Sequence, residues 1–232
     1  MRNNWKNVLA EKNFIISCIV GIGLLVASLI INYYAQGYAL VKESSPVTDL
    51  ILSNIPTFNV DILFMYCPLL LGLILAITCL KSPRKIPLVL KSAAIFVTIR
   101  AVFITFTHLG PYPDHAILDS LDFNFFKVFS TSTNFFLFSG GGDLFFSGHT
   151  GLPFLAALLY WDYKPMRYLC LVSSVFFGTL ALLGHLHYTI DVASAFFITY
   201  TIYIIVTKLF PHDVAAFNNK EYVTENVMHK PL

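Results

Sequence analysis

The chain has 232 residues, of which 56% are hydrophobic and only 12% are charged, and its mean hydropathy is +0.70. Soluble domains usually carry about 25% charged residues, so this composition excludes an ordinary soluble monomer. It also excludes a disordered chain, because there is ample apolar surface to bury. A net charge of +2 without any block of like charges argues against a nucleic-acid partner. We therefore expect an integral membrane protein.

Six apolar segments follow one another along the chain. A helix needs about 20 apolar residues to cross a bilayer, and only the fourth segment is clearly short, although Leu144–Phe146 extend it. The first segment could instead be a secretory signal peptide behind Arg2, Lys6 and Lys12. Its apolar core exceeds the usual limit of about 15 residues and no Ala-x-Ala site follows, which favours a retained span. The predicted spans are about Phe14–Ala35, Val60–Leu80, Pro87–Leu109, His149–Trp161, Met166–Gly184 and Thr189–Phe210.

The distribution of basic residues predicts the orientation. With the N-terminus in the cytoplasm, the cytoplasmic segments hold eleven of the fifteen Lys and Arg residues, whereas the outer loops hold only Lys42 and Lys127. This is the bias of the positive-inside rule, and six spans then place both termini in the cytoplasm. We predict an all-α integral membrane bundle of six transmembrane helices over residues 14–210, with cytoplasmic tails over 1–13 and 211–232.

The third and fourth spans are joined by a long outer loop. Its Phe-rich part, Phe123–Phe138, is interpreted as an interfacial or re-entrant segment over the outer leaflet.

Two short polar segments occur at the outer ends of the later spans. Gly140–Thr150 leads into the fourth span, and Gly184–Asp191 forms the turn between the fifth and the sixth. The fourth span runs inward from His149 and the fifth span returns. We therefore expect His149 and His187, which are 38 residues apart, to meet at the outer mouth of the bundle.

These segments contain the groups needed for nucleophilic chemistry on an anion. His187 and Asp191 have the spacing of neighbours on one face of a helix, and a carboxylate on one imidazole nitrogen makes the other nitrogen a better nucleophile. His149 can then act as a general acid for a leaving group. Ser147 and Gly148, at a helix N-terminus, offer backbone N–H groups and the positive end of the helix dipole to an anion.

Arg100 lies inside the third predicted span. A charge at mid-membrane costs about 2.5–3.5 kcal/mol on insertion scales, so such a residue normally faces the bundle interior and has a function. Its guanidinium can bind a phosphate through two hydrogen bonds. Alternatively, it pairs with an acidic residue of another span. Asp143 also has two interpretations, as a substrate ligand or as the N-cap of the fourth span.

A different use of the histidines is a zinc or haem site formed by His149, His185 and His187. No cysteine lies close to them and Asp191 already accounts for His187, so we expect neither a metal nor a cofactor. Three of the other histidines are typical of capping or interfacial groups; these are His108, His115 and His212.

The two polar segments resemble the motifs of the sphingomyelin synthase family and, more distantly, those of the type-2 phosphatidic acid phosphatase superfamily. The synthase pattern Cys-Gly-Asp-x3-Ser-Gly-His-Thr is similar to Gly141–Thr150, with Gly141 in place of the cysteine. The pattern His-Tyr-Thr-x-Asp-Val-x-x-Ala matches His187–Ala195 throughout. The likeness covers about residues 40–210 in order and with compatible spacing.

Further positions agree with the same family. His185 falls where the family has a histidine, and Arg100 is followed seven residues later by Thr107, as in the family's arginine span. Pro46 and Asp49 match part of a Pro-x-Pro-Asp element in the first outer loop.

The resemblance implies a six-span bundle with an extracytoplasmic site and a phosphohistidine intermediate. His187 would attack phosphorus, Asp191 would orient it, and His149 would protonate the departing alcohol. An acceptor alcohol or water would then take the phosphoryl group. Substrate contacts are expected from Arg100, Asp143, Ser147, Gly148, His185 and Tyr188.

We therefore expect a membrane lipid phosphotransferase that moves a phospho-headgroup from a phospholipid to a ceramide-like lipid alcohol. One alternative is a lipid phosphate phosphatase or phospholipase-C-type hydrolase at the same site, with water as the acceptor. A second alternative is a non-enzymatic scramblase, transporter or membrane-anchored binding protein. The expected partners are these lipids and the bilayer, and the sequence carries no signal for the oligomeric state. The short basic loops favour a multi-pass protein of a bacterial plasma (inner) membrane.

Overall fold

The computed structural model describes residues 2–42, 44–113 and 144–218, and all regular secondary structure within these ranges is helical. The Phe-rich segment 123–138 lies outside them. The elements are α1 (Arg2–Leu9), α2 (Lys12–Val41), η1 (Leu52–Asn54), α3 (Asp61–Lys81), η2 (Pro83–Lys85), α4 (Ile86–Thr107), α6 (Gly148–Leu159), α7 (Lys164–Leu183), α8 (Thr189–Leu209) and α9 (Pro211–Phe217).

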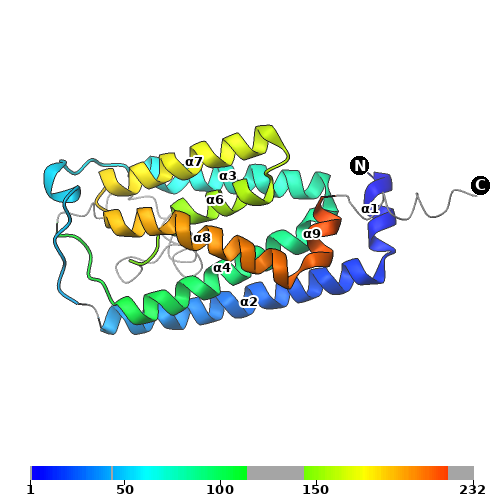
Figure 1. Cartoon of the computed structure of the whole chain (residues 1–232), viewed down its shortest axis with the longest axis horizontal. Coiled ribbons are helices and arrows are strands. Elements are labelled where there is room, and N and C mark those ends of the chain that lie inside the picture. The colour runs from blue at the N-terminus through cyan, green and yellow to red at the C-terminus, as the bar shows by residue number, and fades with distance from the viewer. Residues whose placement is uncertain (1, 43, 114–143, 219–232) are drawn as a thin grey trace, which may run out of the picture.

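The long helices lie side by side along the long axis of the molecule (Figure 1). Five of them, α2, α3, α4, α7 and α8, are long and apolar enough to cross a membrane. The expectation of an all-helical, multi-pass membrane architecture is therefore confirmed for the described residues. Helix α6 has only 12 residues, which is about 18 Å at 1.5 Å per residue and short of a hydrocarbon layer of about 30 Å. A sixth complete span stays a prediction.

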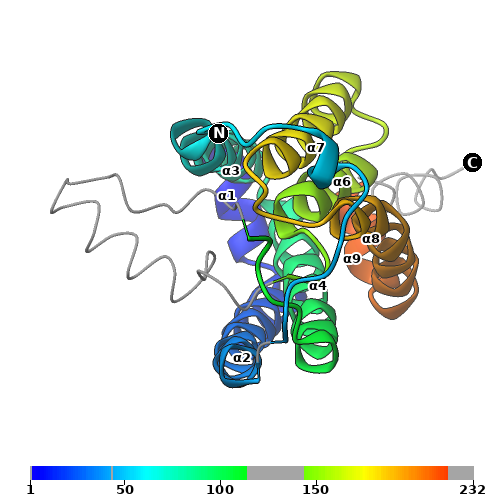
Figure 2. The ribbon, with the colours of Figure 1, turned by 90° about the vertical axis from the view of Figure 1, so that its left-hand side faces the viewer.

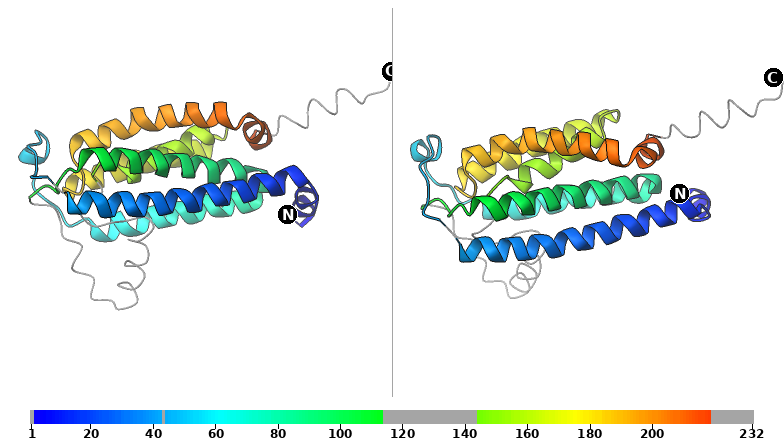
Figure 3. Two further views of the ribbon diagram at one scale, coloured as in Figure 1. Left: turned by 90° about the horizontal axis from the view of Figure 1, so that it is seen from below. Right: turned by 60° about the horizontal axis from the view of Figure 1, so that its bottom comes forward.

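The chain alternates in direction through the bundle. Helices α2, α4 and α7 run away from the end where α1 and α9 lie, and α3, α6 and α8 return toward it (Figures 1 and 3). We call the end with α1 and α9 the terminal end and the opposite end the loop end. The assignment of the terminal end to the cytoplasm stays a prediction.

Helix α6 begins at Gly148, one residue before the predicted start of the fourth span, but the residues expected to extend it are not helical. The apolar run Leu144–Phe146, expected to extend the fourth span, lies outside the helix, which starts at Gly148. The reason is that Ser147 caps the helix: its Oγ accepts hydrogen bonds from the Thr150 N–H (3.4 Å) and hydroxyl (3.2 Å). The Ser147 N–H donates to the carbonyl of Asp191 at 3.1 Å, so the chain enters α6 from beside the first turn of α8.

Small residues let α6 pack closely against the helices around it. A Cβ atom at Gly151 of α6 would lie 2.7 Å from the Phe96 ring of α4 and 2.8 Å from the Thr199 hydroxyl of α8. A Cβ at Gly178 of α7 would lie 3.0 Å from the Thr150 hydroxyl of α6 and 2.9 Å from Val192 of α8. Close approach through small residues is typical of helix association in membranes. Helix α6 is consequently held among α4, α7 and α8, as the end view shows (Figure 2).

A polar cluster fastens α9 to the terminal end. The Lys91 ammonium of α4 donates to the Ser17 hydroxyl at 2.6 Å and to the Asp213 carboxylate at 2.5 Å, and Ser17 donates to Asp213 at 2.6 Å. Phe217 is buried against the Tyr160 ring, with centroids 5.0 Å apart. The first residues of the predicted C-terminal tail therefore form a helix that is docked on the bundle.

We expect Gly151→Ala to lower the thermal stability of the detergent-solubilised protein, because the added methyl group overlaps two buried side chains. Overpacking of this kind costs about 1–3 kcal/mol. Gly23→Ala on α2 is the matched control, since nothing lies within 4 Å of its Cβ position. Its melting temperature should be unchanged or slightly raised, because alanine favours a helix over glycine by about 0.5–1 kcal/mol. Equal melting temperatures for the two variants would contradict tight packing around α6.

Candidate functional site

His187 and Asp191 are in contact at the turn between α7 and α8. The His187 Nδ1 lies 3.4 Å from the Asp191 Oδ2. The sequence predicts that the two share a helix face, but α8 begins only at Thr189 and His187 precedes it. Asp191 is the third helical residue, and its Oδ2 also accepts the Tyr188 N–H at 3.1 Å, which turns the carboxylate back toward His187. The pair is therefore formed by the entry into the helix.

The contact with the buried Asp191 carboxylate determines which imidazole nitrogen of His187 can react. The Asp191 side chain is fully buried, and His187 is 7% exposed. A carboxylate at Nδ1 favours the tautomer that has the proton on Nδ1 and the lone pair on Nε2. The separation of 3.4 Å is long for a hydrogen bond, as is common in sites without substrate. The Nε2 atom of His187 is thus the candidate nucleophile.

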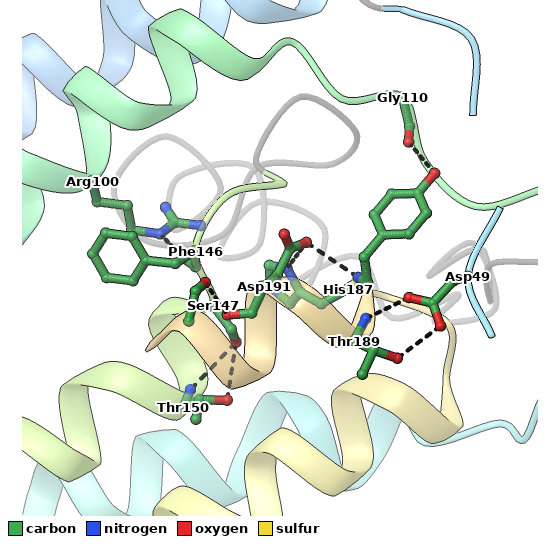
Figure 4. A network of polar contacts seen from close by, with 11 residues as sticks. Asp49, Arg100, Gly110, Phe146, Ser147, Thr150, His187, Thr189 and Asp191 are labelled. Carbon is green, nitrogen blue, oxygen red and sulfur yellow. Dashed lines mark hydrogen bonds and ion pairs between the residues drawn. The ribbon is translucent and has the colours of Figure 1, made fainter. Parts of the chain in front are cut away.

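Arg100 approaches the same place from α4. It is buried, and its Nε donates to the Phe146 carbonyl at 2.9 Å. A Cβ atom at Gly148 would lie 3.4 Å from that nitrogen, so the guanidinium lies over the first turn of α6. Its positive charge acts on both Asp191 and His149. The guanidinium and the N-terminus of α6 together form a positively charged corner beside the His–Asp pair (Figure 4).

His149 is the second residue of α6 and interacts electrostatically with both His187 and Arg100. Its ring packs on Phe64 of α3, with centroids 4.0 Å apart and planes tilted by 33°. The structure therefore brings His149, His187, Asp191 and Arg100 together from α4, α6 and the start of α8, in the region where the sequence predicts that the histidines meet.

Asp49 fastens the loop before α3 to the start of α8. Its carboxylate accepts hydrogen bonds from the Thr189 N–H (2.7 Å) and hydroxyl (2.8 Å), and from the N–H groups of Ile51 (2.9 Å) and Leu52 (3.1 Å). Partial burial opposes ionisation, but these hydrogen bonds outweigh it and lower the pKa of Asp49 from its usual value. The ionised carboxylate thus holds the N-terminus of α8 in place (Figure 4).

Tyr188 and His185 are buried beside the site and bind the neighbouring loops. The Tyr188 hydroxyl donates to the Gly110 carbonyl at 2.8 Å and accepts the Val47 N–H at 3.2 Å. His185 has its Nδ1 3.0 Å from the Thr57 hydroxyl, and its backbone lies in the left-handed region, with φ at 51°. Both residues therefore support the turn that carries His187. A direct contact of either with substrate stays a prediction.

Three predicted substrate ligands lie at or before the start of α6. Ser147 is fully buried, its N–H bonds the Asp191 carbonyl and its hydroxyl caps the helix, so a direct contact of Ser147 with substrate stays a prediction. The first-turn N–H groups of a helix are typical anion-binding groups, and Gly148 and His149 supply them in α6. Asp143 lies outside the described residues.

The alternative zinc or haem ligand set is not assembled in the described part of the chain. The His185 ring contacts Thr57 and meets the edge of the Tyr112 ring, with centroids 5.2 Å apart. No group of three or more His, Cys, Asp or Glu side chains among the described residues is placed to hold a metal ion.

The sequence pattern does not reveal every residue around the site. Asp49 enters only as part of a motif, because its partner Thr189 is 140 residues away and no local pattern connects the two. Phe64 is one apolar residue among many in its span. Asn32 did carry a signal, since an amide within an apolar span is unusual.

Residues 140–209 match the family described as PAP2 superfamily C-terminal. This range contains α6, α7 and α8 together with both polar segments. The match supports the type-2 phosphatidic acid phosphatase superfamily and, with it, a phosphatase-type enzyme of lipid metabolism. Neither a curated protein nor a solved structure gives a significant match to the chain.

We expect Asp49→Ala to accelerate amide hydrogen exchange at Ile51, Leu52 and Thr189, because their N–H groups lose a shared acceptor. The same substitution at the exposed Asp162, in the turn after α6, is the control and should leave exchange at these amides unchanged.

Acidification should have the effect of the Asp49 substitution. The pKa of Asp49 is depressed in the folded protein, so its contribution is present above the unfolded value of about 3.9 and is lost as the pH falls through the folded value. The difference in protection between wild type and Asp49→Ala should therefore shrink only below about pH 4. Unchanged protection of Thr189 in the variant at neutral pH would contradict this role.

Proposed function

We propose that the protein is a membrane lipid phosphotransferase that works through a phosphohistidine and moves a phospho-headgroup from a phospholipid to a ceramide-like lipid alcohol. The observation that carries the proposal is the convergence of the His187–Asp191 pair, His149 and Arg100 where α6 and α8 begin. These groups provide a nucleophile with its orienting carboxylate, a general acid and a cation for phosphate. The superfamily match supports this class of chemistry.

The first half-reaction would form the phosphoenzyme. The Arg100 guanidinium and the first-turn N–H groups of α6 bind the phosphate oxygens of the donor lipid. The lone pair of the His187 Nε2 attacks phosphorus, and the bond from phosphorus to the oxygen of the lipid alcohol breaks. Asp191 stabilises the positive charge that develops on the imidazole. Protonated His149 gives its proton to the leaving oxygen, so a neutral alcohol departs.

The second half-reaction would reverse these roles. His149 is now neutral and takes the proton from the acceptor hydroxyl, whose oxygen attacks the phosphorus held on His187. The bond from phosphorus to nitrogen breaks and its electron pair returns to the Nε2. A lipid acceptor gives transfer, and water gives hydrolysis, so the outcome depends on how well the bound lipid excludes water.

Two observations favour the lipid acceptor and the extracytoplasmic location. The segments that carry the site residues resemble sphingomyelin synthase motifs more closely than phosphatase motifs. The basic residues gather in the segments joined at the terminal end, which supports cytoplasmic termini, six spans and a site on the outer face of a bacterial inner membrane. Hydrolysis at the same residues remains the second candidate, because it proceeds through the same phosphoenzyme.

We expect the purified protein, in liposomes of mixed phospholipids with a fluorescent ceramide, to produce a labelled phospho-ceramide that mass spectrometry identifies. The matched His187→Ala protein should produce none, because it lacks the nucleophile. Diacylglycerol or free phosphate without labelled phospho-ceramide would establish a hydrolase and overturn the transferase proposal. A product profile that is identical in wild type and His187→Ala would contradict an enzyme that works through this residue.

We expect Asp191→Asn to lower turnover by up to about 10⁴-fold while leaving measurable activity, because the carboxylate orients His187 and does not itself react. The Michaelis constant should change much less than the turnover number. Asp162→Asn, in an exposed turn, is the matched control and should retain the wild-type rate. A wild-type rate for Asp191→Asn would remove this residue from the mechanism.

A further inference from the structure

An apolar cavity of about 470 Å³ adjoins the candidate site, between α2, α3, α4 and α6. Small-molecule sites typically enclose about 300–1,000 Å³. Arg100, Gly148 and His149 line one end of the cavity, and Cys79 and Tyr160 line the other. The wall between the two ends is largely aliphatic and aromatic, with Leu71, Leu75, Phe96, Leu152 and Leu155 among its residues. The cavity therefore has a polar head at the site and an apolar body that extends toward the terminal end.

One polar side chain in this wall has an oxygen atom without a hydrogen-bond partner among the described residues. Asn32 of α2 lines the cavity and is 5% exposed, and its amide oxygen has no hydrogen-bond partner among the described residues. In contrast, the Ser92 hydroxyl in the same wall donates to the Leu88 carbonyl at 2.6 Å. A buried acceptor without a donor costs about 1–3 kcal/mol, and inside a bilayer there is little water to relieve it. Asn32 is thus a group that a ligand can satisfy.

Asn32 lies at the polar head of the cavity. Helices α2 and α4 pack side by side and run in the same direction (Figure 1), and a Cβ atom at Gly21 would lie 3.1 Å from the Leu90 Cβ. Because the two helices rise equally per residue, the position eleven residues beyond this contact places Asn32 level with Ala101, the neighbour of Arg100. The unpartnered amide oxygen is consequently close in depth to the guanidinium that would bind the phosphate.

We propose that the cavity holds an acyl chain of the acceptor lipid and that the Asn32 amide oxygen accepts a hydrogen bond from an amide N–H next to the reacting hydroxyl of that lipid. This inference rests on the proposed function, because the reacting hydroxyl has to lie beside His149. The occupant is a bilayer lipid, since only a molecule with a polar head and a long apolar tail matches both the charged end and the apolar body. An N-acyl amino alcohol supplies the required donor. An ester-linked diacylglycerol supplies none beyond its reacting hydroxyl.

The test uses the full chain with His187→Ala, so that no transfer occurs, and measures binding alone. A photo-activatable ceramide and a photo-activatable diacylglycerol of equal chain length compete with their unlabelled forms in liposomes. We expect the ceramide to bind about threefold to tenfold more tightly, as one additional net hydrogen bond provides. Labelled peptides should come from α2, α3, α4 or α6.

Two further substitutions in the His187→Ala protein test whether the preference for ceramide over diacylglycerol depends on Asn32. Asn32→Leu keeps the branched shape and the number of side-chain heavy atoms but removes the acceptor, and it should abolish the preference for ceramide. Ser28→Ala is the matched control: Ser28 is a buried residue of α2 outside the cavity wall whose hydroxyl bonds the Leu25 carbonyl, so the preference should persist. Asn32→Ala, which is smaller and favours a helix, gives the same comparison if the leucine variant does not fold.

The outcomes separate this inference from the proposed function. A preference that persists without Asn32, or equal binding of the two lipids with Asn32 present, would overturn the role of Asn32. Labels found only outside α2, α3, α4 and α6 would overturn the assignment of the cavity. The binding assay needs no turnover, so phosphotransferase activity is judged separately by the product analysis.

Discussion

The hydrogen bond from Arg100 to the Phe146 carbonyl connects the fold of this protein to its candidate site. A bilayer provides no water to non-helical backbone, so such backbone occurs at membrane depth only where the protein satisfies it. Here α4 supplies a donor to the Phe146 carbonyl and α8 supplies an acceptor to the Ser147 N–H. Helix α6 can therefore begin within the bundle. Its first turn, with His149, consequently faces the guanidinium and the His187–Asp191 pair.

Loops that are far from the reacting groups in sequence hold this arrangement in place at the loop end. Asp49 bonds the start of α8, and Tyr188 bonds the backbone at Gly110 and Val47. The turn before α8 is irregular and carries the candidate nucleophile. Hydrogen bonds to charged groups contribute about 1.5–3 kcal/mol to stability, so the hydrogen bonds from Thr189 to the Asp49 carboxylate substantially restrict the movement of that turn. The geometry of the site thus depends on loops that contribute no reacting atom.

The polar groups inside the bundle differ in whether other groups of the protein provide their hydrogen-bond partners. At the terminal end, Lys91, Ser17 and Asp213 bond one another in a closed cluster, which fits a structural role in docking α9. At the head of the cavity, Asn32 is part of the wall, and its buried amide oxygen has no donor within the described ranges. Because unpaired polar groups are costly in a bilayer, this contrast separates groups that complete the fold from a group suited to a lipid ligand.

The sequence by itself determined the class of architecture and the main site residues. The hydropathy of each segment depends on that segment alone, so it predicts the membrane helices without any tertiary information. The spacing of His149 and His187 across two helices predicts that both lie near the same end of the bundle. Only the tertiary structure decided that Leu144–Phe146 lie outside α6, that His187 precedes its helix, and that Asp49 bonds Thr189. The first two depend on how Ser147 and Asp191 cap their helices, and the third joins residues 140 positions apart, so hydropathy and periodicity alone do not reveal them.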